Sequence, residues 1–150
     1  MASSHYRGDS SRDTVKVLSF FLAQFRSSSQ GDRPSGNIGL NRPALIAPIS
    51  ATDLKAMMDR GVSLELVDVR TEEERAIAQI QGSRLLNQEG HDYLVSLDRN
   101  TVMLFQCHHG IRSQSAAEYF LREQGFSNLY NLRGGIDAWS QLVDPSVPRY

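Results

Sequence analysis

The pattern of apolar and polar positions becomes regular from Ile46 onward. Apolar-rich runs at 64–70, 101–106 and 128–132 predict strands, and the middle run is of the nearly continuous kind that a strand buried on both faces shows. Between and after these runs, apolar residues recur at the spacing of amphipathic helices. The helices are predicted at 50–60, from 71 onward, at 91–97, at 113–124 and at 134–143, with one more short strand at 83–87. Strands that alternate with helices over about 100 residues predict the α/β class, with a mostly parallel central sheet and helices on both faces.

Capping residues mark the ends of several predicted helices. Ser50-Ala-Thr-Asp53 and Thr71-Glu-Glu-Glu74 fit the capping-box pattern, in which a hydroxyl and a carboxylate satisfy backbone N–H groups of the first turn. Gly61 and Gly125 are predicted to follow the last turns of their helices. Ser113 is predicted to cap the helix that follows the 101–106 strand.

Residues 1–43 differ in composition from the rest of the chain. Residues 26–36 are rich in Ser, Gly and Pro, which is typical of a linker, and 15–25 show the spacing of a short amphipathic helix. We predict a flexible N-terminal segment over 1–43 and one domain over 44–150. The apolar run within 15–25 is far shorter than the roughly 20 residues of a membrane-spanning helix. A signal peptide is the alternative interpretation of this run, but no cleavage-site pattern follows it.

Charge and cysteine content restrict the partners and the compartment. A formal net charge of −1 gives no reason to expect binding to nucleic acid or to an anionic membrane surface. The chain has a single cysteine, Cys107, so it forms no intramolecular disulfide. We therefore expect a cytoplasmic protein with a reduced thiol.

Cys107 stands in the turn between a buried strand and a helix, which is where ligands bind in open α/β sheets. The positive end of a helix and the N–H groups of a tight loop lower a cysteine pKa from about 8.5 toward roughly 3.5–7.5. Gly110 lets the backbone amides turn inward, and Arg112, with His108 or His109 if protonated, adds positive charge. A lone cysteine is often a small buried apolar residue. These polar neighbours favour instead a thiolate nucleophile.

Three segments resemble the rhodanese family of sulfurtransferases, and the resemblance covers roughly residues 49–142. They are Leu66-Val-Asp-Val-Arg70, Cys107-x-x-Gly110-x-Arg112-Ser113 and Asn131-Leu-Arg-Gly-Gly-Ile-Asp-Ala-Trp139. The resemblance implies a three-layer fold and a single-domain enzyme whose cysteine carries a sulfane sulfur as a persulfide. It also implies a small anionic donor, typically thiosulfate, and an acceptor that is cyanide or a thiol, including a protein thiol. No cofactor is expected.

The resemblance assigns expected roles to individual residues. Cys107 matches the residue that bears the persulfide. The loop residues that vary with substrate are matched by His108, His109, Gly110, Ile111 and Arg112. Asp68 and Arg70 match a pair at a strand end, and we expect them, with Ser113, to support the loop and the sheet, because buried charges are usually paired. Packing roles are implied for Gly134, Gly135 and Trp139. Many members have a His-Ile-Pro-Gly-Ala-like stretch where this chain has Gln79-Ile-Gln-Gly-Ser83.

Three other functions fit parts of the pattern. Cysteine-dependent phosphatases place five residues between Cys and Arg, whereas four separate Cys107 from Arg112, and a shorter loop encloses less space for three phosphoryl oxygens. A non-catalytic module that binds a partner would have no need of the intact Cys107. Metal binding by Cys107, His108 and His109 is disfavoured because adjacent side chains rarely converge on one ion, so no metal is expected.

Overall fold

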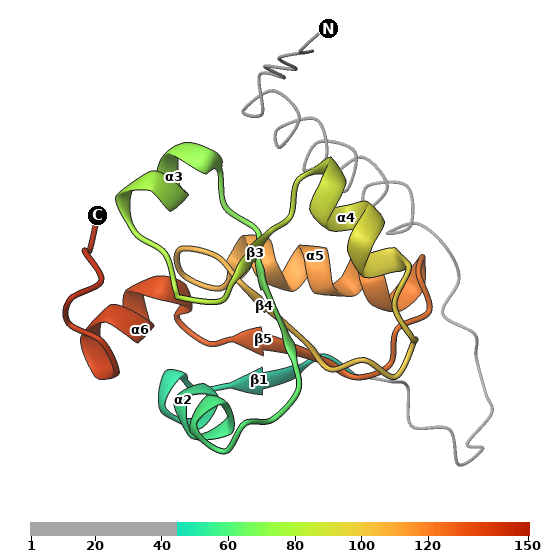
Figure 1. The fold of residues 1–150 in the computed structure, drawn as a ribbon, viewed down its shortest axis with the longest axis horizontal. Helices are drawn as coiled ribbons and strands as arrows, with labels where there is room; N and C mark the ends of the chain where they lie inside the picture. Colours follow the sequence, from blue (N-terminus) through green and yellow to red (C-terminus); the bar gives the residue numbers. More distant parts are fainter. Residues whose placement is uncertain (1–44) are drawn as a thin grey trace, which may run out of the picture.

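The computed structural model describes residues 45–150, so the flexible segment, helix and linker predicted within residues 1–43 lie outside the described residues. Strands and helices alternate strictly along this part of the chain (Figure 1). The strands are β1 (Ala47–Ile49), β2 (Glu65–Asp68), β3 (Arg84–Leu85), β4 (Met103–Gln106) and β5 (Leu129–Leu132). The helices are α2 (Ala51–Asp59), α3 (Glu72–Ile77), α4 (Gln88–Val95), α5 (Ile111–Arg122) and α6 (Gly135–Leu142).

The strands form one five-stranded sheet in the order β1-β5-β4-β2-β3, and every pair in it is parallel. The α/β class predicted from the sequence is confirmed. Strand β1 was not predicted, because it has only three residues and contains Pro48. A proline lacks the N–H that a central strand needs, and β1 accordingly lies at an edge, where it pairs with β5.

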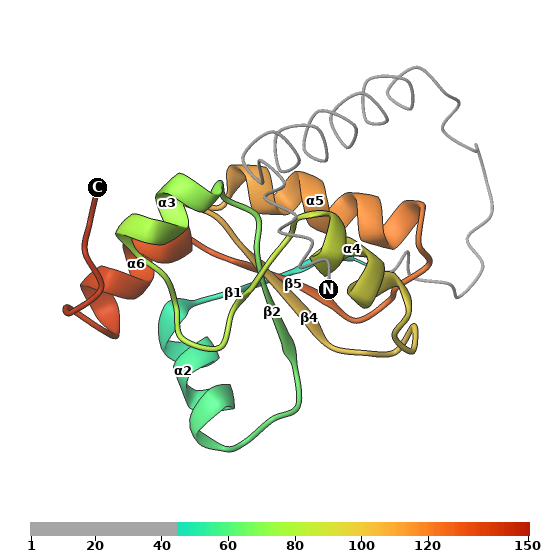
Figure 2. The same cartoon turned by 45° about the horizontal axis from the view of Figure 1, so that its top comes forward.

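Alternate side chains of β4 pack on opposite faces of the sheet. Met103 and Phe105 belong to the apolar cluster that includes residues of α4 and α5, whereas Leu104 belongs to the cluster with α2 and α6. In Figure 2, α5 lies above the strands and α2 below them. Burial of a side chain of this size stabilises a fold by about 1.5–3 kcal/mol, so the two clusters hold the three layers together.

The helix ends show which capping predictions were correct. The full capping box between Thr71 and Glu74 is present, while Ser50 makes its half of the predicted box by accepting from the Asp53 amide. The prediction for Ser113 was wrong: α5 begins two residues earlier, after Gly110 at φ +103°. Because this glycine adopts a left-handed conformation, the chain enters the helix directly from the loop and needs no side-chain cap.

Helix α4 was placed too late by the sequence pattern, which predicted it at 91–97. The helix starts at Gln88, because the side chain of Asn87 accepts a hydrogen bond of 2.8 Å from the Gly90 amide and caps it. The strand predicted at 83–87 is present as the shorter β3.

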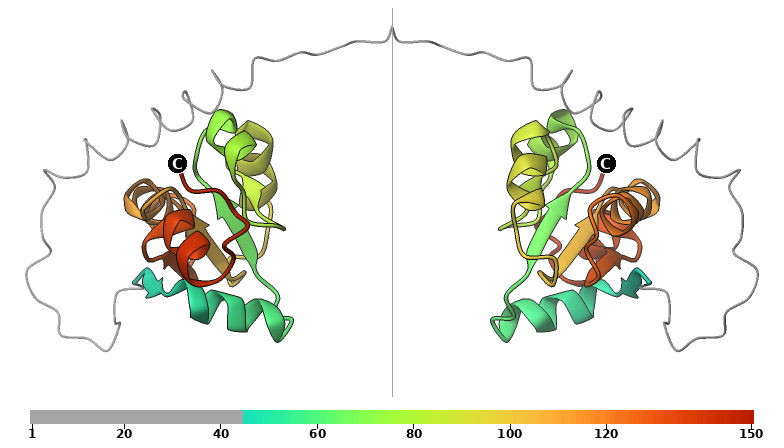
Figure 3. Two further views of the ribbon diagram at one scale, coloured as in Figure 1. Left: turned by 90° about the vertical axis from the view of Figure 1, so that its left-hand side faces the viewer. Right: turned by 90° about the vertical axis from the view of Figure 1, so that its right-hand side faces the viewer.

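The carboxyl ends of the parallel strands meet at one edge of the sheet. Helix α3 lies at this edge, and Figure 3 shows the chain after α6, residues 143–150, passing between α6 and α3. We call residues 143–150 the C-terminal segment. Within residues 45–150, no helix combines the length and the apolar character needed to cross a bilayer.

Candidate active site

Cys107 directly follows β4 and begins a short loop, residues 107–110, that leads into α5. Its side chain is 1% exposed, and its Sγ atom accepts a hydrogen bond of 3.1 Å from the Gly110 amide. The left-handed Gly110 is needed here, since a Cβ atom at this position would lie 3.2 Å from the carbonyl oxygen of Leu132. The loop therefore closes around the sulfur and directs a backbone N–H group at it.

The first turn of α6 holds the carbonyl groups of this loop. The amide of Ile136 donates to the Cys107 carbonyl at 2.8 Å, and the amide of Asp137 donates to the His108 carbonyl at 3.2 Å. Gly135, at φ +59°, permits this approach, because a Cβ atom there would lie 2.3 Å from the Cys107 oxygen. The resemblance implied a packing role for Gly135. The close packing that this glycine permits turns the carbonyl oxygens of Cys107 and His108 toward α6.

Asn131 on β5 connects the end of the Cys107 loop to the first turns of α5. Its Oδ1 atom accepts a hydrogen bond of 2.6 Å from the hydroxyl of Ser113, and its Nδ2 atom donates to the Gly110 carbonyl at 3.0 Å and to Gln114 Oε1 at 3.1 Å. The Ser113 hydroxyl also lies 3.2 Å from the Cys107 sulfur. Ser113 makes these contacts from a buried position inside α5.

Arg112 forms a two-pronged ion pair with Glu74 of α3. Its Nη1 and Nη2 atoms donate to the two carboxylate oxygens, each at 2.8 Å. The hydrogen bond from Arg112 lowers the pKa of Glu74 to about 2, against the opposing effect of burial. The same pair raises the pKa of Arg112, to which negative charge on Cys107 also contributes. The guanidinium therefore lies within electrostatic range of the sulfur, but its terminal nitrogens are occupied.

Asp68 and Arg70 are both fully buried and bonded to each other at the end of β2. Arg70 donates through Nε to one oxygen of Asp68 at 3.0 Å and through Nη2 to the other at 2.8 Å. It also donates to the Ala78 carbonyl at 2.6 Å, while Arg75 donates to Asp68 at 3.0 Å. A buried ion pair needs such further hydrogen bonds to offset desolvation. These contacts attach α3 to the end of β2.

The comparisons with known proteins agree with this geometry. The model of the rhodanese-like domain family matches residues 50–142, which is more than half of the chain. The chain belongs to the rhodanese family. The resemblance seen in the sequence is thereby confirmed.

Relatives of this rhodanese domain include bacterial sulfurtransferases. It is 38% identical over 98 residues to the thiosulfate sulfurtransferase GlpE of Pseudomonas aeruginosa strain LESB58, which covers 65% of this chain and 84% of the relative. The corresponding protein of Ectopseudomonas mendocina is 39% identical over 95 residues, 63% of this chain and 82% of the relative. A rhodanese-like domain protein from Staphylococcus aureus is similar in structure, with a TM-score of 0.54 and 30% identity over 63% of this chain and 91% of that chain. The family and these relatives support sulfur transfer as the general activity.

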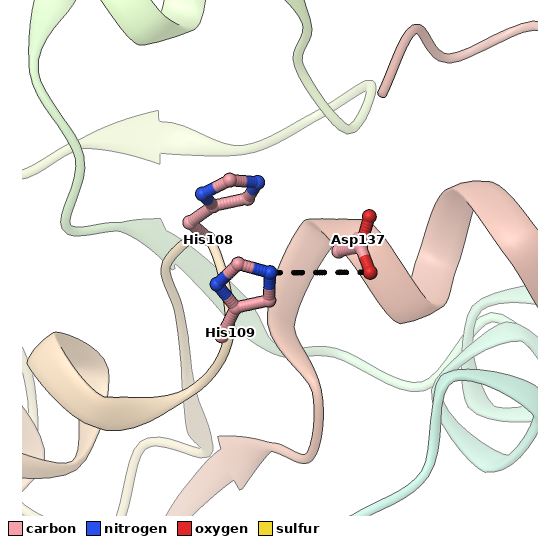
Figure 4. Close-up of side chains that lie close together, drawn as sticks. All are labelled: His108, His109 and Asp137. Carbon is pink, nitrogen blue, oxygen red and sulfur yellow. Dashed lines mark ion pairs between the residues drawn. The ribbon is translucent and has the colours of Figure 1, made fainter. Parts of the chain in front are cut away.

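The two histidines of the Cys107 loop stack on each other. Their ring centroids are 3.9 Å apart, and the Tyr150 ring stacks on His108 at 4.1 Å and 8°. His109 Nε2 lies 4.0 Å from the carboxylate of Asp137 at the start of α6 (Figure 4). Burial, and next the charge of His109, lower the pKa of His108, which favours its neutral form. Ile111 is 80% exposed at the rim of the loop.

His108, His109 and Asp137 offer metal-ligating atoms that all lie within 4.8 Å of one another. Adjacent histidines rarely converge on one ion, so this cluster was not predicted from the sequence. It forms because the first turn of α6 packs against the Cys107 loop. Asp137, however, is already paired with Arg149 at 2.8 Å. An ion would therefore compete with Arg149 for the carboxylate, and the absence of a metal stays a prediction.

Proposed function

We propose that the domain transfers a sulfane sulfur through a persulfide on Cys107. The donor is a small anion such as thiosulfate, and the acceptor is cyanide or a thiol, including a protein thiol. The family and the relatives support sulfur transfer in general. The observation that carries the proposal is the position of the Cys107 sulfur, which faces the Gly110 amide at 3.1 Å in a loop whose first two carbonyls are bonded to α6.

In the first step, the Cys107 thiolate attacks the outer sulfur of thiosulfate. A new S–S bond forms to that sulfur, the bond between the two thiosulfate sulfurs breaks, and its electron pair leaves with sulfite. The cysteine then carries a persulfide anion, and the total charge of −3 is the same on both sides of this step, by the general chemistry of thiolate attack. No external oxidant or reductant is required.

In the second step, the acceptor attacks the outer sulfur of the persulfide. Cyanide takes up this sulfur and leaves as thiocyanate, whereas a thiolate acceptor takes it up and leaves as a persulfide. In both cases the electron pair of the broken S–S bond returns to Cys107. Because the donor product departs before the acceptor reacts, ping-pong kinetics are expected. The nucleophile must stay reduced between turnovers, which is consistent with our expectation of a cytoplasmic location.

The loop supplies hydrogen-bond donors where the persulfide anion forms. The Gly110 amide already faces the sulfur, and the Ser113 hydroxyl lies 3.2 Å from it. The Gly110 amide is fixed in place before charge develops, so it stabilises an anion without reorganisation, whereas the Ser113 proton must first leave Asn131. We assign to Arg112 the attraction of the anionic donor, and to His108, His109 and Ile111 the lining of the entrance through which donor and acceptor reach the sulfur.

Intact mass spectrometry tests this proposal. After incubation with thiosulfate, wild-type protein should gain the mass of one sulfur atom and lose it on treatment with a reductant, and Cys107→Ser should gain nothing. The matched control is Ser96→Ala, a hydroxyl removed from the exposed end of α4, which should load like wild type. If wild type takes up no sulfur from thiosulfate or any other sulfane donor, the proposal fails. Hydrolysis of an aryl phosphate would favour phosphatase chemistry, and partner binding retained by Cys107→Ser without sulfur transfer would favour a scaffold.

A further inference from the structure

Tyr150 and Glu74 meet beside the Cys107 loop, although they lie 76 residues apart in the chain. The Tyr150 hydroxyl donates to Glu74 Oε1 at 2.8 Å and accepts from Arg70 Nη1 at 3.0 Å. The tyrosine ring stacks on His108. The C-terminal segment thus connects the buried pair at the end of β2, the carboxylate of α3 and the first residue after the nucleophile.

Two arginines near the Cys107 loop are paired with carboxylates. Arg112 uses both terminal nitrogens on Glu74, and Arg149 is paired with Asp137. A small oxyanion that approaches Cys107 therefore meets the Glu74 carboxylate together with the guanidinium. The hydrogen bond from Arg112 keeps the pKa of Glu74 at about 2, so this carboxylate is ionised throughout the physiological range.

We infer that Glu74, held in place by Tyr150, is a specificity-determining residue that disfavours dianionic donors relative to monoanionic organic persulfides. A thiosulfate dianion has to compete with the Glu74 carboxylate for the terminal nitrogens of Arg112. A monoanionic organic persulfide lacks the oxygens of thiosulfate and carries one negative charge instead of two. It therefore depends less on the Arg112 guanidinium, and the Glu74 carboxylate repels it less. This inference rests on the proposed function and narrows its substrate class.

The chemistry with the preferred donor is the same displacement at sulfur. The Cys107 thiolate attacks the outer sulfur of RSS⁻, the original S–S bond breaks, and RS⁻ leaves with the electron pair. One anion enters and one anion leaves, and the cysteine becomes a persulfide. The donor supplies all the sulfur and the electrons, so nothing else is consumed.

Glu74→Gln tests the inference, with Glu73→Gln as its matched control. Both variants remove one negative charge from α3, but Glu73 is exposed, whereas Glu74 contacts Arg112. Glutamine also preserves the capping-box pattern. For thiosulfate, we expect Glu74→Gln to raise kcat/KM on the order of tenfold, mainly through KM. With the persulfide of 2-mercaptoethanol as donor, whose only charge is the persulfide anion, kcat/KM should change by less than about twofold, and Glu73→Gln should match wild type with both donors.

Tyr150→Phe provides a second, milder variant, since it keeps the ring on His108 and removes only the hydroxyl. It should shift the ratio of kcat/KM for thiosulfate to kcat/KM for the persulfide in the same direction, by a smaller factor. If Glu74→Gln does not fold, Tyr150→Phe alone tests the inference. An unchanged ratio in these variants overturns the inference. A loss of thiosulfate activity in Glu74→Gln also overturns it, because Glu74 would then orient Arg112 for the donor.

The outcomes also separate the two proposals. If Cys107 loads with sulfur and the donor ratio is the same in all variants, only the inference about Glu74 fails. If no sulfane donor loads Cys107 in any variant, the proposed function fails and the inference with it. Thermal unfolding of each variant, measured in parallel, shows whether a kinetic change reflects a loss of folded protein.

Discussion

Ser113 on α5 donates its hydroxyl proton to Asn131 on β5 at 2.6 Å, and the same oxygen lies 3.2 Å from the Cys107 sulfur. A hydroxyl has one proton, so it cannot donate to both partners at once. While Asn131 holds the proton, the contact with the sulfur requires an S–H donor. When Cys107 becomes a thiolate or a persulfide, the proton of Ser113 is better placed on the sulfur, because hydrogen bonds to charged groups are the stronger ones.

Replacing Ser113 by alanine should therefore slow sulfur transfer more than it destabilises the fold. A hydrogen bond to a charged group is worth about 1.5–3 kcal/mol, which predicts a decrease in kcat/KM of roughly tenfold to a hundredfold. Steady-state kinetics with thiosulfate and cyanide measures this. Ser113→Thr, which retains the hydroxyl, should recover most of the activity, and wild-type kinetics in Ser113→Ala would rule out the role.

The close approach of α6 to the Cys107 loop predicts the effect of a second substitution. A Cβ atom at Gly135 would lie 2.3 Å from the Cys107 oxygen, whereas one at Gly61, which also has a positive φ, has nothing within 4 Å. Gly61→Ala should cost about 1–2 kcal/mol of unfolding free energy from its backbone conformation alone. Gly135→Ala should cost roughly 1–3 kcal/mol more, because the loop or α6 must move.

Urea unfolding of the two glycine variants measures this difference directly, and Gly61→Ala is the matched control for backbone strain. Sulfur loading of Cys107 should fall in Gly135→Ala and not in Gly61→Ala. Equal stabilities of the two variants would mean that the contact between α6 and the loop carbonyls contributes little.

The sequence predicted the centre of this site because its residues are neighbours in the chain. The run from Cys107 to Arg112 follows an apolar strand and precedes a helix, and both features have a local signal. Asp68 and Arg70 likewise stand at the end of a recognisable strand. Parallel strands end at one edge of the sheet, so the prediction of the fold already placed these groups on the same side.

The surroundings of the site could not be predicted in the same way, because they arise from contacts between distant segments. Glu74 fits a capping box, and nothing in that pattern shows that its carboxylate also faces Arg112, 38 residues away. Tyr150 has no local signal, because its role depends on the path of the C-terminal segment. Ser113 shows the opposite error: its residue type favoured a cap, while packing placed it inside α5 against Asn131.

The low pKa of Glu74 predicts how the stability of the domain depends on pH. Folding lowers this pKa from 4.5 to about 2, mainly through the hydrogen bond from Arg112. A carboxylate with a lowered pKa adds stability that is fully present above about pH 4.5 and is lost as the pH falls toward 2. The shift corresponds to at most about 3 kcal/mol, and because the Arg112 side chain is 39% exposed, solvent reduces this to about 1–2 kcal/mol.

Urea unfolding of wild type and Glu74→Gln between pH 6 and pH 2.5 measures this contribution. Wild type should be more stable at pH 6, and the two curves should converge as the pH falls, because a protonated carboxyl resembles the neutral amide. Glu73→Gln should follow wild type throughout. A difference between wild type and Glu74→Gln that does not change with pH would contradict an ionised Glu74 paired with Arg112.

The stack of Tyr150 on His108 predicts the titration of that histidine. Burial is the main cause that lowers the pKa of His108, and the charge of His109 is the next. Tyr150→Ala removes the ring but keeps the backbone carbonyl, so the pKa of His108 should rise toward its ordinary value as water reaches the imidazole. Tyr150→Phe keeps the ring and should leave the pKa low. NMR titration of the His108 imidazole measures both. If the pKa is the same in wild type and Tyr150→Ala, the C-terminal segment does not cover this side of the site in solution.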